Sequence, residues 1–309
     1  MIVHCLEQIK HWPQTDSRLT IFRRYRLNFM PNSAPPGKIL RGGEFYSPVR
    51  ARVNAADAVL SELCQPVARS MPRHEHELAY VTIMLDGQYL EGDQGKLDEL
   101  RPFTAVFNPV GATHSTVIGP AGASLFTIEF LQQNLRGLDL RLPERTLRDG
   151  GVGAILWPGL RLFSAFKTHG MDSLLLEGHV FELLGAIGRL DRSPEKTAPR
   201  WLTRVQDRIH AEFSSRLRMR DLAREAGVHP VHLARVFRRF EKRSPGEYQQ
   251  QLQLRAACEL LRDPQWPLAT IAAECGFADQ SHFTRVFRRM TATTPLRFRQ
   301  AIAPRSRVA

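Results

Sequence analysis

The sequence is poor in cysteine and in long apolar runs. Its four cysteines, Cys5, Cys64, Cys258 and Cys275, show no spacing typical of a disulfide framework or of a thiolate metal cluster. No apolar run approaches the roughly 20 residues that a membrane-spanning helix needs. The first residues also lack the basic segment and apolar stretch of a secretory signal. We therefore expect a soluble protein of the cytoplasm.

Acidic residues are much fewer than basic residues in only one part of the chain. The 309 residues carry a net charge of +12. Residues 201–309 hold 20 Lys and Arg against 10 Asp and Glu, whereas residues 1–200 hold 23 against 21. A basic excess concentrated on one region predicts a surface that meets a polyanion, and the alternative is a solvated basic face.

The basic region contains an internal repeat. Residues 232–239, HLARVFRR, recur 50 residues later as residues 282–289, HFTRVFRR. Upstream, residues 222–228 match residues 271–277 in their apolar, small and glycine positions. Conserved spacing over this length indicates a repeated structural unit. Each copy predicts a short helix, a turn at Gly227 or Gly276, and a second helix that carries arginines.

This pattern predicts two helix-turn-helix units, whose second helices enter the DNA major groove. Arg235 and Arg285 are the expected base readers, because arginine pairs bidentately with guanine. Arg238, Arg239, Arg288 and Arg289 are expected at phosphates or in ion pairs with Glu241 and other acids, and a single arginine can also be a plain surface charge. The full predicted DNA-binding set is Val231, His232, Arg235, Arg239, Gln280, Ser281, Arg285 and Arg289.

The middle of the chain predicts a β-rich domain. Short apolar strands separated by turn residues run from about Arg41 to Phe130, which indicates a sandwich or small barrel. Asp86-Gly87 predicts a hairpin turn, and the stretches 108–111 and 119–122 predict corners. Within this region, His74 and His76 lie two residues apart, so on one strand they face the same side.

The segments His74-Glu75-His76 and 109–114, PVGATH, resemble the two motifs of the cupin barrel. Metal-binding cupins usually add a glutamate four or five residues after the second histidine, where this chain has Tyr80 and Val81. His74, His76 and His114 are thus expected to contact a small effector. Two alternatives stay open: a three-histidine metal site, and a structural role in the barrel.

After Phe130 the pattern becomes helical. A helix is predicted over 158–167, and a second after Asp172-Ser173 carries a broad apolar stripe. One face of that helix is expected on the barrel, and the rest either packs internally or meets a partner subunit. The stripe comprises Leu174, Leu175, Val180, Phe181, Leu183, Leu184, Ile187 and Leu190. Residues 192–200 are polar and hold two prolines, which predicts a linker.

Residues 201–300 resemble the DNA-binding domain of the AraC/XylS family of bacterial transcription regulators. The stretch 271–287, IAAECGFADQSHFTRVF, followed by Thr294-Pro295 and Phe298, carries the resemblance most specifically. One departure is His229, where the family often has a serine helix cap. The histidine is expected to weaken the cap or to reach a phosphate.

The resemblance implies an effector-controlled, sequence-specific transcription regulator, acting as a homodimer on promoter DNA with RNA polymerase as a partner. The fold expected is α+β, a cupin-like barrel with helices followed by an all-α domain. A metal-dependent cupin enzyme with an appended DNA-binding domain is the alternative; no cofactor is expected beyond a possible metal in the barrel. The predicted segments are an extension 1–40, a barrel 41–135, helices 136–191, a linker 192–200 and a DNA-binding domain 201–309 with units near 219–240 and 268–290.

Overall fold

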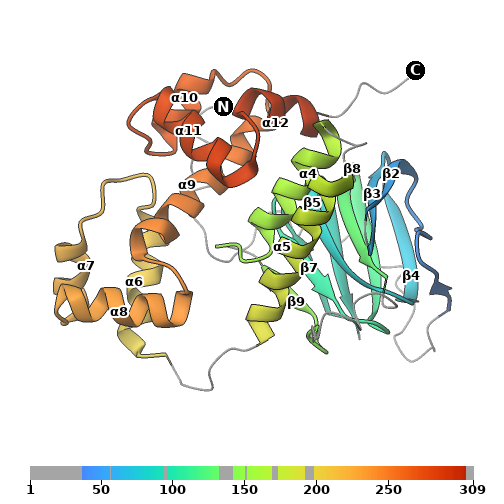
Figure 1. Cartoon of the computed structure of the whole chain (residues 1–309), viewed down its shortest axis with the longest axis horizontal. Helices are drawn as coiled ribbons and strands as arrows, with labels where there is room; N and C mark the ends of the chain where they lie inside the picture. Colours follow the sequence, from blue (N-terminus) through green and yellow to red (C-terminus); the bar gives the residue numbers. More distant parts are fainter. Residues whose placement is uncertain are drawn as a thin grey trace. The chain divides into compact units, whose positions relative to one another are not determined.

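The computed structural model describes residues 37–55, 57–93, 96–131, 142–149, 152–168, 173–191 and 198–303. The chain divides into two compact units whose main spans are residues 18–193 and 194–288. We call them the sheet unit and the helical unit (Figure 1). Most of the predicted extension 1–40 and of the predicted linker 192–200 lies outside the described residues.

The described part of the sheet unit contains a nine-stranded sheet. Strand β8 is its centre, because β8 pairs with β4 and β5 through its first half and with β3 and β5 through its second. Only β1 runs parallel to its partner, β4. The strands are β1 Ile39–Leu40, β2 Val49–Ala55, β3 Ala58–Gln65, β4 Arg69–His76, β5 Ala79–Asp93, β6 Lys96–Leu100, β7 Ala105–Asn108, β8 Thr113–Phe130 and β9 Leu147–Asp149.

Asp86 and Gly87 form a bulge inside β5, so the predicted hairpin turn was wrong. The register of the pairing with β8 shifts on both sides of these residues. Gly87 has a φ of +101°, and a Cβ there would lie 2.1 Å from the carbonyl oxygen of Gly122 on β8. Both strands bend together at these glycines, and β8 therefore continues through the predicted corner at 119–122. Asp-Gly supplies the positive φ for a turn or a bulge, and the pairing with β8 selects the bulge. The predicted turn at 108–111 is confirmed between β7 and β8.

Two helices complete the sheet unit: α4 Leu156–Thr168 and α5 Ser173–Asp191. Helix α4 packs on the sheet, where Phe126 of β8 meets the rings of Phe163 and Phe166 at centroid distances of 5.3 and 5.2 Å. The Asp149 carboxylate accepts hydrogen bonds from the first backbone N–H groups of α4, which stabilises the start of this helix. Buried aromatic rings on both sides of this contact form the core of the unit.

Helix α5 has two apolar faces. Val180, Leu183 and Leu184 are buried, as one face of the predicted stripe requires. Leu174 is 78% exposed and Phe181 is 42% exposed, so the other face remains open to solvent. The apolar stripe therefore extends over two faces of α5. One face is buried within the sheet unit, and the other is exposed.

The helical unit consists of α6 Arg200–Ala211, α7 Met219–Ala226, α8 Pro230–Glu241, α9 Pro245–Leu261, α10 Leu268–Glu274, α11 Gln280–Thr291 and α12 Pro295–Ile302. The helix predicted over 230–241 is confirmed as α8. Leu233 and Phe237 of α8 are buried as predicted, whereas Val236 and Phe240 stay partly exposed. In α11 the predicted inward residues Phe283, Val286 and Phe287 are all buried. Across the described residues, none of the helices is both long and apolar enough to span a membrane.

Candidate functional site

The first helix-turn-helix unit consists of α7, a turn at Gly227, and α8. Gly227 has a φ of +68°, the left-handed conformation that ends α7. The backbone N–H of Val228 then donates to the carbonyl of Ala223 at 3.0 Å. His229 caps α8, because its Nδ1 accepts the N–H of Val231 at 3.3 Å and its carbonyl accepts the N–H of Leu233. His229 thus supplies the side-chain cap at which α8 begins.

The second unit repeats this geometry with α10, Gly276 and α11. Gly276 has a φ of +79°, and the N–H of Phe277 donates to the carbonyl of Ala272 at 2.9 Å. Asp279 occupies the position equivalent to His229, and its carboxylate accepts the N–H of His282 at 2.7 Å. Both second helices therefore begin at a side-chain cap, which fixes their first turns.

Helix α9 joins the two units and is tied to both. A capping box of Ser244 and Glu247 defines its first turn. The Gln253 amide donates to the carbonyl of Phe213 at 3.0 Å and to that of Gly276 at 3.4 Å. The segment before α7 and the turn of the second unit are thus held by one side chain of the connecting helix.

The face of α8 and α11 opposite the core is polar and exposed. In α8, Val231 is 69% exposed, and the Nη2 of Arg235 lies 3.3 Å from the Nδ1 of His232. In α11, Ser281, Arg285 and Arg289 are exposed likewise, whereas His282, the counterpart of His232, is partly buried. The predicted DNA-binding residues on these faces are Val231, His232, Arg235, Arg239, Gln280, Ser281, Arg285 and Arg289.

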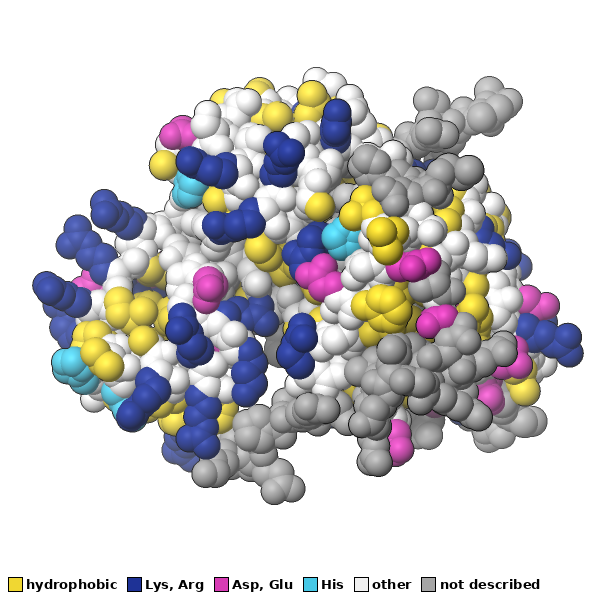
Figure 2. Space-filling model, in the orientation of Figure 1, with side chains coloured by type: hydrophobic (Ala, Val, Ile, Leu, Met, Phe, Trp, Pro, Cys, Tyr) yellow, Lys and Arg dark blue, Asp and Glu magenta, His cyan; other side chains and the backbone are white. Residues whose placement is uncertain are grey.

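Further arginines lie at the start of the first unit. Arg216, Arg218 and Arg220 are exposed immediately before and within the first turn of α7. These arginines are not among the residues predicted to bind DNA, although their alternation with apolar residues, RLRMR, is a visible signal. Other arginines of the helical unit form ion pairs with acidic side chains. Arg208 of α6, for instance, pairs with Glu225. Figure 2 shows Lys and Arg side chains gathered over the visible face of the helical unit.

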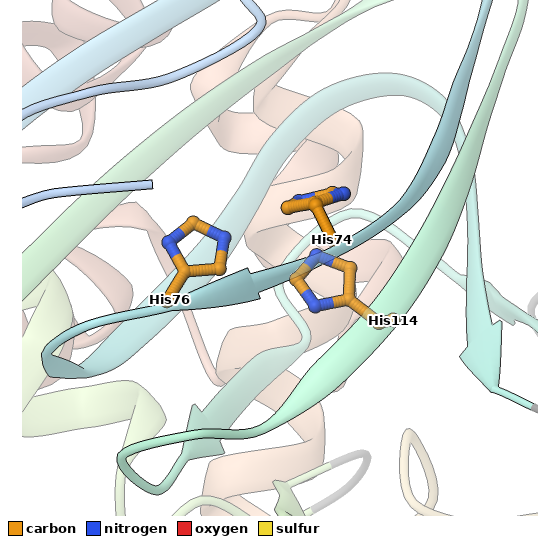
Figure 3. A group of neighbouring side chains, drawn as sticks. All are labelled: His74, His76 and His114. Carbon is orange, nitrogen blue, oxygen red and sulfur yellow. The ribbon is translucent and has the colours of Figure 1, made fainter. Parts of the chain in front are cut away.

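The three predicted histidines of the sheet unit come together. Strand β4 places His74 and His76 on one face, and β8 places His114 opposite His74 in register. The His114 ring centroid lies 4.3 Å from that of His74 and 5.3 Å from that of His76. One ring nitrogen from each residue lies within 4.8 Å of the others. Figure 3 shows the rings gathered on one side of the paired strands.

All three rings are buried and neutral. The exposed fractions of His74, His76 and His114 are 3%, 5% and 7%. Burial, together with the neighbouring imidazoles, lowers the pKa of His76 to about 2 and that of His114 to about 3. Burial also lowers the pKa of His74. Each ring therefore keeps an unprotonated nitrogen at physiological pH.

Hydrogen bonds orient two of the rings. The Nδ1–H of His74 donates to the carbonyl oxygen of Pro72 at 2.8 Å, and the Nδ1 of His114 lies 3.4 Å from the Tyr80 hydroxyl. The Asn108 amide donates to this hydroxyl at 2.9 Å. The Nδ1 of His76 is buried and has no hydrogen-bond partner among the described residues. Tyr80, which stands where a cupin-type carboxylate ligand is absent, thus belongs to the same cluster.

The histidines line a pocket. Its empty volume is about 420 Å³, including its open mouth. The segment 45–47 forms part of the wall, and the Glu129 carboxylate accepts the N–H of nearby Gly43 at 2.8 Å. Burial raises the pKa of Glu129 to about 7, although the Gly43 hydrogen bond and Arg52 act in the opposite direction. The lining residues are Leu40, Phe45, Tyr46, Ser47, Leu63, Met71, His74, His76, Tyr80, Thr82, Tyr89, His114, Thr116, Leu125 and Thr127.

Comparisons with known proteins find similar sequences for the helical unit. A family model described as "Helix-turn-helix domain" matches residues 222–301. The regulatory protein SoxS of Salmonella typhimurium is 35% identical over 81 residues, which are 26% of this chain and 76% of SoxS. The Msm operon regulatory protein of Streptococcus mutans is 28% identical over 138 residues, 43% of this chain and 49% of that protein. The chain thus spans about half the length of the latter relative.

A solved structure is also similar in this region. It is a transcriptional regulator from Chromobacterium violaceum described as having an AraC-type DNA-binding domain. It is 27% identical, covers 34% of this chain and 95% of its own, and superposes with a TM-score of 0.32.

Proposed function

The chain belongs to the AraC/XylS family of transcription regulators, and from that premise we propose how it reads DNA and what controls it. Both helix-turn-helix units bind one promoter site, with α8 and α11 in successive major grooves. The observation that carries this proposal is the pair of capped, arginine-bearing helices whose exposed faces repeat at equivalent positions. Successive major grooves on one face of a duplex lie about 34 Å apart.

Contacts with base edges and contacts with phosphates come from different parts of α8 and α11. Arg235 and Arg285 lie in the second turn and reach base edges, helped by side chains of the first turn. Arg239 and Arg289, at the far ends, contact phosphate, together with Arg238 and Arg288. The first-turn side chains of this proposal are Val231, His232, Gln280 and Ser281.

The sheet unit binds a small-molecule effector in the histidine pocket. The pocket opens to solvent and is lined by both apolar and polar side chains, as small-ligand sites are. The apolar walls offer such a ligand contact area. A few buried polar groups, among them His74, His76 and His114, fix its orientation. The effector controls DNA binding only if it binds one state of the protein more tightly than another. The nine strands, with β8 paired on both sides, support the barrel form of the sheet.

The open face of α5 supports a homodimer. Leu174 and Phe181 lie seven residues apart, so they share one side of the helix, and both are exposed. Covering them with the same face of a second chain removes apolar area from water. The family resemblance implies two further partners, promoter DNA and RNA polymerase. It also implies that the protein acts in the cytoplasm.

Selection of random double-stranded DNA by the full chain tests this proposal. We expect enrichment of a site with two short motifs about 10 base pairs apart, centre to centre. The Arg235→Ala variant should lose preference within one motif and the Arg285→Ala variant within the other. Enrichment of no sequence, or of one unchanged motif in both variants, contradicts paired reading by α8 and α11.

A further inference from the structure

We propose that His74, His76 and His114 bind a divalent transition-metal ion in the pocket of the sheet unit. This metal site deepens the proposed effector role of the pocket, and the DNA-binding role does not depend on it. Three imidazoles from two paired strands are brought within 4.8 Å of one another and are almost wholly shielded from solvent. Imidazole nitrogen is a common ligand of zinc, copper, iron and nickel, whereas magnesium and calcium prefer oxygen.

The hydrogen bonds leave the metal-facing nitrogens free. The Nδ1–H of His74 donates to the Pro72 carbonyl, which leaves its Nε2 with a lone pair. In the tautomer with a proton on Nδ1, His114 donates to the Tyr80 hydroxyl in the same way. A backbone carbonyl or another acceptor on the outer nitrogen is the usual support of a metal-bound histidine.

His76 supplies a second, independent observation. Its ring is 95% buried, and its Nδ1 has no hydrogen-bond partner among the described residues. A buried polar atom without a partner costs free energy, so purely structural histidines normally have their nitrogens paired. With the ring proton on Nδ1, the Nε2 of His76, which Figure 3 shows turned towards His74 and His114, keeps its lone pair for an ion between the rings.

The distances allow the site with a small adjustment. Metal–nitrogen bonds of about 2.0–2.1 Å bring three imidazole nitrogens to roughly 3–3.5 Å of one another. The rings must therefore close in by the order of 1–2 Å from their present separation, which side-chain rotation can supply.

Three ligands leave coordination positions open towards the pocket. The Tyr80 hydroxyl is already engaged, because it accepts the Asn108 amide N–H at 2.9 Å and lies 3.4 Å from the His114 Nδ1, so it is not counted as a fourth ligand. The open side thus accepts water or an oxygen or nitrogen donor of an effector. We infer that the effector class includes small carboxylates and other chelating anions, because these pair with a cation held by neutral ligands.

Metal binding by the full chain, purified with a tag free of histidine and stripped with chelator, tests the inference. Zn²⁺ alone is titrated by calorimetry, Co²⁺ alone by visible absorption, and bound metal is counted by mass spectrometry. We expect one ion per chain, a Co²⁺ spectrum typical of nitrogen ligands, and a loss of affinity of at least about 100-fold in His76→Ala and in His114→Ala. His179→Ala is the matched control, because His179 lies beside Glu182 on α5, outside the pocket.

Absence of stoichiometric binding by the unaltered chain overturns the inference, and so does equal affinity in His76→Ala. A shift of the thermal midpoint on adding Zn²⁺ to the unaltered chain, absent in His76→Gln, supports it without relying on an alanine variant that folds poorly. DNA binding is measured on the same samples. Sequence-specific DNA binding without any metal binding rejects the metal site alone, whereas metal binding without DNA binding rejects the proposed function alone.

Discussion

Gly276 lies so close to Ser214 that a Cβ at this glycine would be 2.2 Å from the Ser214 carbonyl oxygen. Gly276 is the turn residue of the second helix-turn-helix unit, and Ser214 precedes the first helix of the other. Gln253 donates to the carbonyls of Phe213 and Gly276, on either side of this contact. The turn of the second unit therefore meets the segment before α7 backbone to backbone, at a point where only glycine fits.

Replacing Gly276 by alanine should destabilise the helical unit by about 2–4 kcal/mol, because it combines a positive φ with a clash against backbone. Gly227→Ala is the matched control. Gly227 has a similar φ of +68°, but a Cβ there meets no atom within 4 Å. We expect it to cost only about 1 kcal/mol. Urea unfolding followed by circular dichroism gives both values, and equal costs would show that the contact with Ser214 is unimportant.

Arg285→Ala should weaken binding to the selected DNA site by about 1–3 kcal/mol and flatten base preference at one position. Arg288→Ala, one turn later on α11, should weaken all sequences alike, because it contacts phosphate. The comparison uses competition binding against single-base variants of the site. An unchanged base preference in Arg285→Ala would remove Arg285 from the base readers.

Affinity for DNA should fall steeply with salt. Each neutralised phosphate adds about 0.9 to the slope of log affinity against log salt. Four or more contacts therefore predict a loss of at least about 100-fold between 50 and 200 mM salt. The double variant Arg216→Ala with Arg218→Ala should lower the slope by about 1–2, whereas Arg41→Ala in the sheet unit should not change it. A flat dependence in the unaltered chain is incompatible with a DNA-binding role for the basic region.

The helical unit follows closely from the sequence, because its signals are local. Pro230 opens α8 at the predicted residue, and Gly227 and Gly276 adopt the positive φ that their positions in the repeat predict. Helix caps, glycine turns and the 3.6-residue period all act within a few residues of one another. What the sequence did not show is the contact between Gly276 and Ser214, because it joins residues far apart in the chain.

The sheet unit was harder to predict for the same reason. The sequence Asp86-Gly87 is compatible with a hairpin turn and with a β-bulge. The close approach of Gly122 on β8 selects the bulge. The histidine cluster was partly visible, since an i, i+2 pair shares a strand face. The register of His74 with His114, and the unpartnered nitrogen of His76, depend on strand pairing and burial, which no local pattern contains.

The proposed homodimer can be tested on α5. Leu174→Glu with Phe181→Glu should convert the protein to a monomer, because charges cannot be buried against an apolar partner face. Sedimentation measures the mass. Leu296→Glu, at an exposed leucine of α12, is the control and should leave the mass unchanged. A dimer that survives the α5 changes must use another surface.

Stability of the sheet unit should depend on Glu129 near neutral pH. Its folded pKa is raised to about 7, above the ordinary value of about 4.3 in the unfolded chain. Between these values the folded state keeps the proton that the unfolded state has lost, so stability falls as pH rises from about 4.5 to about 7. Glu129→Gln keeps an acceptor for the Gly43 N–H but does not titrate. Relative to the unaltered chain, this variant should therefore gain about 1–3 kcal/mol between pH 5 and pH 8 in urea unfolding. Parallel pH profiles for the two proteins would mean that Glu129 is already ionised in the folded state at pH 5, and that Arg52 and the Gly43 N–H outweigh its burial.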